Sequence, residues 1–229
     1  MTKISITIPS LYPDALGRTM DNIEDVTTGD YEVIVVSPFR FERENVVWVE
    51  ETERKGCAAA HHIAAKAATG DFLVAFADDH VFVDGWDAVA IENFRRRESV
   101  FLQRGGHSSF EPAPFCLGLR HTYPQHVGTE FGITYPYFPL LRRSAVDRVG
   151  WIGPDYRSGF GDSDLGMRVW EAGGRVEFSE EGLIVVTSDD GRKPGALCGC
   201  HGRASQGGHP EARSGLPHRG RRRPGHRPR

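Results

Sequence analysis

Hydrophobic and polar residues recur along the first hundred positions with two distinct periods, that of a strand and that of a helix. Strict alternation from Met1 to Pro9 is typical of a strand, and Leu16, Met20 and Ile23 recur at the spacing of one helix face. A continuous apolar run such as that at positions 33–36 indicates a strand buried on both sides. The pattern predicts, in order, a strand at 4–8, a helix at 14–25, strands at 31–36 and 46–49, a helix at 57–69, a strand at 72–77 and a helix at 87–97.

The order of these elements predicts an α/β fold with a mostly parallel central sheet flanked by helices. Gly70 is the expected C-cap of the helix before it. Residues 105–139 are rich in Gly, Pro, His and aromatic residues and lack a clear period, which is typical of a functional loop region. Regular structure is expected again as a strand near 140–141, a helix at 164–172 and two strands at 175–178 and 183–186.

A charged cluster ends the apolar run that begins at Phe72. Asp78, Asp79 and His80 follow six apolar residues, and ligands of open α/β sheets bind at the carboxyl ends of such strands. If strand geometry continues through the cluster, Asp78 and His80 share one face and Asp79 takes the other. A carboxylate beside an imidazole suits a divalent cation that also carries substrate oxygens. The alternative interpretation is that the carboxylates cap a turn and His80 is a surface residue.

Charge divides the chain into two parts. Residues 1–190 carry 18 Lys and Arg against 30 Asp and Glu, a net −12, whereas residues 191–229 carry 10 against 1, a net +9. The second part has almost no β-branched or aromatic residues, so it cannot form a core and is expected to be disordered. We therefore predict one domain over 1–190 and a basic tail over 191–229.

The composition of the tail has two interpretations. An arginine-rich arm for nucleic acid or anionic lipid is one. A Gly, Arg and Pro-rich segment also matches the out-of-frame translation of GC-rich coding sequence, and this second interpretation is favoured. The pair Cys198 and Cys200 with His201 is similar to half of a zinc site, but the later histidines lack the usual spacing.

The sequence favours a cytoplasmic protein. The amino terminus reads as a strand rather than a signal peptide, and no apolar stretch approaches the ~20 residues of a membrane span. The four cysteines, Cys57, Cys116, Cys198 and Cys200, are too scattered to predict a disulfide framework.

Five segments in order resemble family 2 glycosyltransferases, which have the GT-A fold. The resemblance covers roughly residues 3 to 187 and is strong because the segments keep the usual order and spacing. The segments are the opening strand ending in Pro9-Ser10, the second strand 31–36, Lys55-Gly56 with His62 in the place of the usual Asn, the strand 70–80 running into Asp78-Asp79-His80, and Gly161-Asp162-Ser163-Asp164-Leu165 followed by Arg168 and Gly173.

The resemblance implies a single GT-A domain that moves a sugar from a nucleotide-diphosphate donor to an acceptor hydroxyl, as a hexosyltransferase-type enzyme. Residues 1–100 are expected to bind the nucleotide sugar, and residues 101–190 to supply the acceptor site and the catalytic base. Three departures stand out: Ser37-Pro38 replaces the usual acid that touches the nucleobase, His80 replaces the last Asp of Asp-x-Asp, and Gly161 replaces Glu. Asp-x-His is the variant that polypeptide N-acetylgalactosaminyltransferases use.

The metal site is expected at Asp78, Asp79 and His80. Negative charge grows on the departing diphosphate, so a divalent cation is needed there, Mn²⁺ or Mg²⁺. Framing the motif on Asp78 makes His80 the second ligand, and framing it one residue earlier makes Asp79 the ligand. Strand alternation favours His80.

Asp162 is the candidate base for the acceptor hydroxyl, which by resemblance implies inversion. It precedes a predicted helix, so an N-cap is the structural alternative. Asp164, one turn inside, is the rival base or a structural residue. Donor binding is expected at Pro9, Ser10, Lys55, Gly56, Asp78 and Asp79. Lys55 or Arg54 is expected to pair with the diphosphate, although Lys55 equally fits a solvated helix start.

Other site assignments are weaker. Aromatic residues suited to stacking on acceptor sugars occur in the loop region and just after it, although ordinary packing explains most of them. They are Tyr123, Phe131, Tyr135, Tyr137, Phe138 and Trp151. His61 and His62 are adjacent on one helix, so at most one faces the pocket.

Other function classes fit less well. Sugar nucleotidyltransferases and Rossmann oxidoreductases need a glycine-rich loop after the first strand, where this chain has Pro9-Ser10-Leu11-Tyr12-Pro13. The net −12 of the body argues against nucleic-acid binding. A degenerate GT-A domain that only binds nucleotide or glycan is the alternative to the enzyme. The expected partners are a nucleotide-diphosphate sugar and a carbohydrate or other hydroxyl acceptor.

Overall fold

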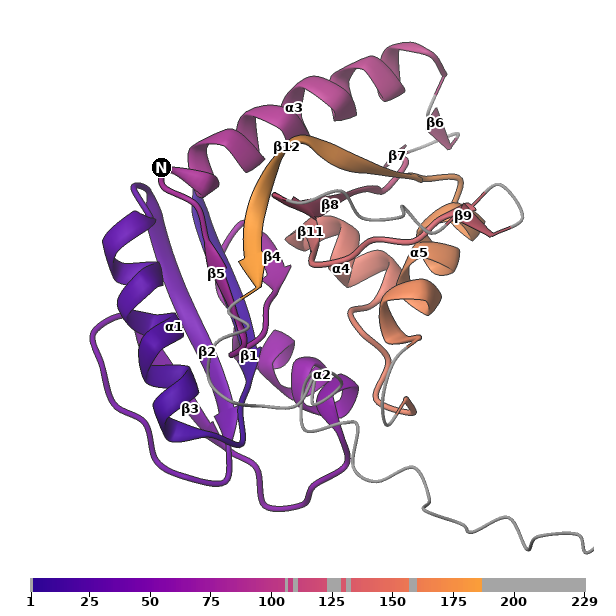
Figure 1. Ribbon diagram of the computed structural model, residues 1–229. Helices are drawn as coiled ribbons and strands as arrows, with labels where there is room; N and C mark the ends of the chain where they lie inside the picture. Colours follow the sequence, from indigo (N-terminus) through magenta and orange to yellow (C-terminus); the bar gives the residue numbers. More distant parts are fainter. Residues whose placement is uncertain are drawn as a thin grey trace, which may run out of the picture.

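The computed structural model describes residues 2–105, 107–108, 111–122, 129–130, 133–156 and 160–186. Within these residues an eight-stranded mixed sheet carries helices on both faces (Figure 1), which confirms the predicted α/β class. The strands of the sheet are β1 (Lys3–Pro9), β2 (Asp30–Ser37), β3 (Val46–Glu50), β4 (Phe72–Ala75), β5 (His80–Phe82), β8 (Phe115–His121), β11 (Pro139–Arg142) and β12 (Arg175–Val186). The helices are α1 (Pro13–Val26), α2 (Cys57–Ala67), α3 (Trp86–Gln103), α4 (Arg143–Val149) and α5 (Gly161–Glu171).

The sheet has the order β3-β2-β1-β4-β11-β8-β12-β5. Its first four strands are all parallel, as predicted, because β1 pairs with β2 and β4, and β2 pairs with β3. β11 runs antiparallel to both neighbours, whereas β12 is parallel to β8 and antiparallel to β5. Two small ribbons lie outside the sheet, β6 (His107–Ser108) with β7 (Glu111–Pro112) and β9 (Thr129–Glu130) with β10 (Ile133–Thr134).

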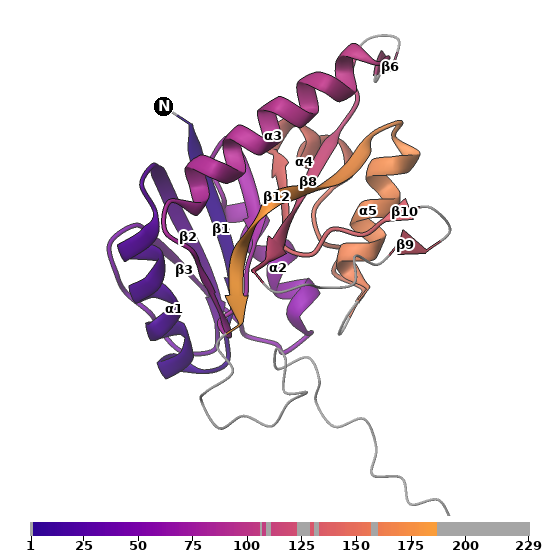
Figure 2. The same cartoon turned by 45° about the horizontal axis from the view of Figure 1, so that its top comes forward.

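Each central strand supplies side chains to two separate cores. Phe72, Val74 and Phe76 pack on the side of α1 and α3, while Leu73 and Ala75 pack on the side of α2, α4 and α5. Figure 2 shows α1 and α3 on one face of the sheet and α2 with α5 on the other. Burial on both faces explains why the strand is a continuous apolar run. Full burial of each large side chain stabilises the fold by about 1.5–3 kcal/mol.

The order of the strands creates a switch point between β1 and β4. The chain builds β2 and β3 on one side of β1, then crosses to place β4 on the other side. The carboxyl ends of β1, β2, β3 and β4 therefore meet at one edge, and the crevice between diverging connections is where ligands of open α/β sheets bind.

The strand leading to the charged cluster is shorter than predicted. β4 ends at Ala75 rather than at 77, and His80 already belongs to β5, which pairs with β12 at the far edge of the sheet. The chain turns at Asp78 and Asp79, so strand alternation does not govern this cluster. The expectation that alternation puts Asp78 and His80 on one face is therefore wrong.

An aromatic stack fixes this turn. The ring of Phe82 lies parallel to the rings of Phe76 and Trp86, with centroids 3.8 Å and 3.7 Å away. The Thr19 hydroxyl of α1 lies 3.1 Å from the carbonyl oxygen of Asp78 and 3.2 Å from that of His80. The stack and this hydroxyl together hold the turn against the core on the side of α1 and α3.

Several elements differ from the sequence prediction. β8 lies inside the segment expected to be a loop, α4 was not predicted, and α3 continues to Gln103 instead of ending at 97. The two strands predicted at 175–178 and 183–186 form one strand, β12, with register shifts around Gly182. β8 has no alternation because it lies between β11 and β12 with six of its seven residues buried.

Gly70 is not a helix cap. α2 ends at Ala67, and the capping residue is Ala68 in an extended conformation. Gly70 is required for close packing instead, because a Cβ there would lie 2.8 Å from the Lys3 carbonyl oxygen and from the Ser5 hydroxyl. The predicted basic tail, 191–229, lies outside the described residues. No helix in the described part of the chain is long and apolar enough to cross a membrane.

A buried carboxylate joins β2 to β1 at the amino end of the sheet. Glu32 accepts hydrogen bonds from the Ser5 hydroxyl at 2.6 Å, the Lys3 ammonium at 2.9 Å and the Thr69 backbone N–H at 2.5 Å. Burial raises the pKa of Glu32, but the hydrogen bonds from Ser5, Lys3 and Thr69 outweigh it and lower the pKa to about 2. The ionised form is therefore the one that stabilises the fold.

We expect Glu32→Gln to lower the free energy of unfolding at pH 7 by about 2 kcal/mol. Because the folded pKa lies below the unfolded one, this contribution is present above about pH 4.5 and is lost as the pH falls towards 2. Denaturant unfolding of wild type and variant at pH 7 and pH 3 measures the difference, with exposed Glu44→Gln as the control. An equal deficit at both pH values would contradict this account.

Candidate active site

Polar residues follow each of the four parallel strands at the switch-point edge. Ser10 follows β1, Ser37 ends β2, Glu51 follows β3, and Asp78 follows β4 within three residues. The Ser10 N–H donates to the Val36 carbonyl at 3.0 Å, which extends the ladder between β1 and β2. The Ser10 hydroxyl donates to Asp78 Oδ2 at 2.6 Å, so the ends of β1 and β4 are joined through side chains. The predicted residues Ser10 and Asp78 are thus brought together.

Asp79 and His80 form a buried pair. Asp79 Oδ1 lies 2.5 Å from His80 Nδ1, and both side chains are less than a tenth exposed. The His80 ring packs against the rings of Phe138, 4.8 Å away, and His121, 5.2 Å away. The ring contacts hold the imidazole in place, and the contact with Asp79 engages its Nδ1. The second ring nitrogen, Nε2, is thus on the side of the ring away from Asp79.

A thiol shows that the site carboxylates lie together. Cys57 begins α2 and is only partly exposed. Burial raises the pKa of its thiol to about 12, and the negative charges of Asp78, Asp79, Glu51 and Asp162 add to this effect. Four carboxylates, from two strand ends and one helix, therefore lie close enough to one cysteine to act on its pKa. Sequence reasoning had found three of the four, but neither Glu51 nor Cys57.

Asp162 is held near this thiol by close packing of two helix starts. Gly161 begins α5, and a Cβ placed on it would lie 3.6 Å from the Ala58 Cβ of α2 and 2.7 Å from Ile152 Cγ2. The residue before it, Phe160, has φ +61° and is the N-cap, so Asp162 is not the cap. Burial raises the pKa of Asp162, against the hydrogen bond it accepts from the Ser163 N–H at 2.8 Å.

Asp164 lies in a different network. Its carboxylate accepts from Arg168 Nε at 2.9 Å, one turn further along α5. The same guanidinium donates to the Trp151 carbonyl at 2.7 Å and to the Val149 carbonyl. This network fixes the loop between α4 and α5, whereas the Asp162 carboxylate takes no part in it.

The other predicted donor residues are arranged less closely. Pro9 ends β1, directly before the site, and Gly56 has φ +105° at the start of α2. Lys55 is exposed and its ammonium lies 2.7 Å from Glu53. Burial raises the pKa of the Glu51 carboxyl, and the charge of nearby Arg54 opposes this effect. The described ion pair of Lys55 is therefore with Glu53, outside the carboxylate group.

The acceptor residues proposed from sequence are only partly placed. Tyr123 and Phe131 lie outside the described residues. Phe138, with φ +43°, packs on His80 and His121, and Trp151 is buried in the core beside α5. Sequence reasoning missed His121, since its strand, β8, was not predicted.

Metal ligands are supplied by the site only in part. Among the residues that the structure describes, no group of three or more His, Cys, Asp or Glu is arranged to hold a metal ion. Mg²⁺ is usually bound in proteins by one or two carboxylates together with substrate phosphates and water. Asp78 with the Asp79–His80 pair fits that kind of site, in which the substrate completes the coordination.

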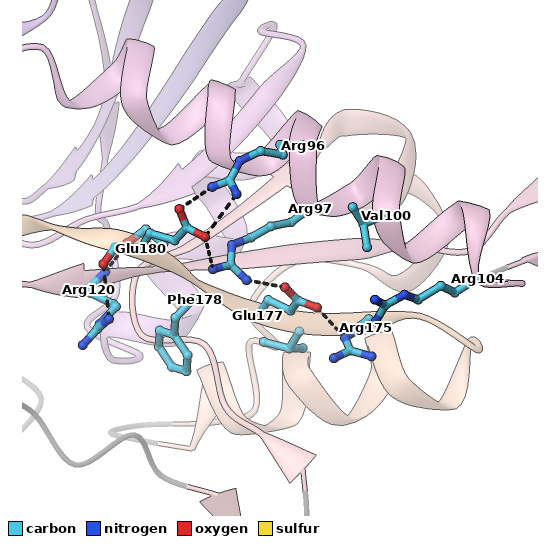
Figure 3. A pocket seen from close by; sticks show the side chains of 11 residues that line it. Arg96, Arg97, Val100, Arg104, Arg120, Arg175, Glu177, Phe178 and Glu180 are labelled. Carbon is cyan, nitrogen blue, oxygen red and sulfur yellow. Dashed lines mark hydrogen bonds and ion pairs between the residues drawn. The ribbon is translucent and has the colours of Figure 1, made fainter.

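A second, arginine-rich groove lies between α3 and β12 (Figure 3). Two of its arginines, Arg96 and Arg97 of α3, form ion pairs that tie the helix to the strand. Arg96 lies 2.5 Å from Glu180, and Arg97 bridges Glu180 and Glu177 at 3.0 Å and 2.6 Å. Arg175 pairs with Glu177 at 2.6 Å. Ion pairs at a protein surface contribute at most about 1 kcal/mol each to the free energy of unfolding. We therefore assign these pairs a role in positioning α3 on β12 rather than a large role in stability.

His61 lies below the site, on the side of α2 that faces β1. Its Nδ1 is 2.9 Å from the Thr7 hydroxyl, which also lies 3.2 Å from the Val74 carbonyl. Complete burial lowers the pKa of His61 to about 3, so the ring is neutral at pH 7. His62, its neighbour, is only partly buried.

Solved structures of similar fold include proteins in complex with nucleotide sugars. The sequence matches no protein-family profile and no curated protein. The structure is similar to S. aureus TarS 1-349 in complex with UDP-GlcNAc, with a TM-score of 0.58 and 14% identity over 83% of this chain and 60% of that one. It is also similar to the mannosyltransferase PcManGT from Pyrobaculum calidifontis in complex with GDP-Man and Mn²⁺, with a TM-score of 0.57 and 18% identity over 82% and 58%. The chain thus shares the fold of these two proteins and spans about 60% of their length.

We expect the fold to lose stability as the pH falls below about 6.5, because the unfolded state protonates His61 and the folded state resists protonation down to about pH 3. The limiting slope is about 1.4 kcal/mol per pH unit. Denaturant unfolding between pH 7.5 and 5 measures the slope of the free energy of unfolding against pH. His61→Gln should flatten this slope, whereas His62→Gln should leave most of the slope unchanged. An unchanged slope in His61→Gln would overturn this assignment.

Proposed function

We propose that this chain is a metal-dependent, inverting glycosyltransferase of family 2 that moves a hexosyl group from a nucleotide-diphosphate donor to an acceptor hydroxyl. One observation carries the proposal. Asp78, Asp79 and Asp162 gather around Cys57 at the switch point of a sheet that has a glycosyltransferase fold. The nucleotide sugars in the neighbouring structures, UDP-GlcNAc and GDP-Man, support the class of donor.

Donor phosphates and a divalent cation belong, in this proposal, beside Asp78. The cation neutralises the charge that develops on the departing diphosphate. Asp78, with its other oxygen held by Ser10, supplies a carboxylate ligand, and His80 is oriented by Asp79 through Nδ1. A carboxylate that fixes the far nitrogen of a histidine is the usual support for a metal-binding imidazole. Mn²⁺ suits such a mixed site, and PcManGT contains this ion.

Asp162 is the proposed general base. Its burial raises its pKa, which strengthens it as a proton acceptor. Its carboxylate accepts hydrogen bonds from Ser163 and from its own backbone N–H, all local to the start of α5, and it takes no part in the Asp164–Arg168 pair, so it is proposed to face an acceptor hydroxyl. Asp164 is tied to Arg168 and is proposed to hold the loop that precedes the base. Attack assisted by a base on the face opposite the leaving group inverts the anomeric centre.

The two halves of the domain divide these tasks. Residues 1–100 supply the parallel strands and the donor residues, and residues 101–190 supply Asp162 and the walls around it. Phe138, which packs on His80, is the described residue proposed to line the acceptor side.

Binding of donor and cation is expected to stabilise the fold jointly. We expect GDP or UDP with MnCl₂ to raise the melting temperature more than either does alone, because a ligand that binds only the folded state stabilises it. Asp78→Asn should abolish the joint effect, and Asp84→Asn, an exposed acid beyond the turn, should leave it intact. A wild-type melting temperature that no combination changes would refute the proposal.

Asp162→Asn separates the enzyme from a binding module. We expect it to lower the release of nucleoside diphosphate from a panel of nucleotide sugars and hydroxyl acceptors by roughly 10²–10⁴-fold, since a base contributes about that factor. Thermal stabilisation by nucleotide and Mn²⁺ should persist. The exposed Asp155→Asn is the control. Stabilisation of the wild type without turnover of any donor would instead favour the degenerate module.

A further inference from the structure

The edge of the sheet is an ordered row of side chains. Glu51, Ser37, Ser10 and Asp78 follow β3, β2, β1 and β4, which is also their order in space. Neighbouring strands lie about 4.8 Å apart, so Glu51 is roughly 14 Å from the Asp78 end of the row. If the phosphates lie at the switch point beside Asp78, the rest of an extended nucleotide reaches towards β2 and β3 in the direction of Glu51.

Glu51 faces the same crevice as the catalytic carboxylates. Its N–H donates to the Ser37 carbonyl at 2.9 Å, which continues the pairing of β2 and β3 by one residue. Alternation along the strand puts Glu51 on the side of Val49, which packs in the core beneath α2. Its charge acts on Cys57, as do those of the catalytic carboxylates. The side chain is thus placed over α2, while Glu50 points to the other face and is exposed.

The carboxylate of Glu51 is partly buried and is available to a ligand. No hydrogen bond to it is found among the described residues, and Arg54 is its charged neighbour. The Glu51 oxygens are not among the buried unpaired atoms of the described residues, so the N–H groups of a ligand would replace water there. Its place in the row therefore suits a ligand that brings N–H groups.

The Ser37 side chain is not available to bind the N–H groups of a ligand. Its hydroxyl donates to the Phe39 carbonyl at 2.6 Å and accepts from the Trp48 indole at 3.1 Å. The next residue, Pro38, has no N–H to offer. Glu51 faces the crevice and has no ion-pair partner at bonding distance among the described residues. Glu53, the next acid after β3, is paired with Lys55.

We propose that Glu51 binds the nucleobase of the donor and selects guanine. Guanine presents two adjacent donors, N1–H and the 2-amino group, which match the two oxygens of a carboxylate. Uracil offers one N–H between two carbonyls, and adenine and cytosine place an acceptor nitrogen beside the amino group, which a carboxylate repels. The inference rests on the proposed function, since it assigns the base of that same donor.

Calorimetric titration of the full chain with GDP, IDP and UDP in MnCl₂ tests it. IDP differs from GDP only by the missing 2-amino group, so the pair isolates one hydrogen bond without changing the protein. A hydrogen bond to a charged group corresponds to roughly 10- to 100-fold in affinity. We expect wild type to bind GDP more tightly than IDP and UDP by about this factor. Glu51→Gln should bring GDP close to IDP, and Glu50→Gln should keep the wild-type preference.

The outcomes separate this inference from the function on which it rests. A GDP preference that disappears only in Glu51→Gln supports it, and Glu51→Asp, which shortens the carboxylate without removing it, should keep a reduced preference. Equal binding of GDP and IDP by wild type, tighter binding of UDP, or a preference that Glu51→Gln retains would overturn the inference while nucleotide binding stands. Failure of wild type to bind any of the three would overturn both.

Discussion

The site depends on the stack of Phe76, Phe82 and Trp86. Two parallel ring contacts in the core bring together a residue just after β4, a residue of β5 and the first residue of α3. The chain between Phe76 and Phe82 must turn within five residues, and those residues contain Asp78, Asp79 and His80. Hydrophobic packing thus determines where the polar chemistry lies, because a loop anchored at both ends by buried aromatic rings has little freedom to move its carboxylates.

The acidic residues of this chain fall into two groups with different partners. Glu32 accepts several hydrogen bonds, and Asp164 pairs with Arg168, so both hold backbone segments in place. Asp162 accepts hydrogen bonds only from its own end of α5 among the described contacts, Glu51 lies near Arg54, and Asp78 accepts from the Ser10 hydroxyl just after β1. A partly buried carboxylate without full compensation raises the energy of the free protein, and a ligand that supplies the missing donors or positive charge recovers that energy. Four of the acids in the body, Asp78, Asp79, Glu51 and Asp162, are therefore gathered at one edge of the sheet.

Local patterns were sufficient for the amino-terminal half of the fold. β1 to β4 and α1 to α2 are buried on known faces, and their periodicity is undisturbed. β8 could not be found, because a strand between two others carries no alternation and its neighbours β11 and β12 are distant in sequence. The turn at Asp78 was missed for a similar reason: the apolar residues Phe76 and Ala77 continue the strand pattern, and only the long-range contacts of Phe76 end it. The grouping of Asp78 with Asp162 followed from the resemblance, whereas Glu51 required the spatial order of the strands.

The glycine at the start of α5 has a consequence for the residues that can stand beside Asp162. A Cβ at position 161 would lie 2.7 Å from Ile152 Cγ2 but at an ordinary contact distance, 3.6 Å, from the Ala58 Cβ of α2. A side chain there would therefore have to displace Ile152. The acid that the resemblance leads one to expect at this position has no room unless Ile152 moves, so the start of α5 presents Asp162 without an acidic neighbour before it.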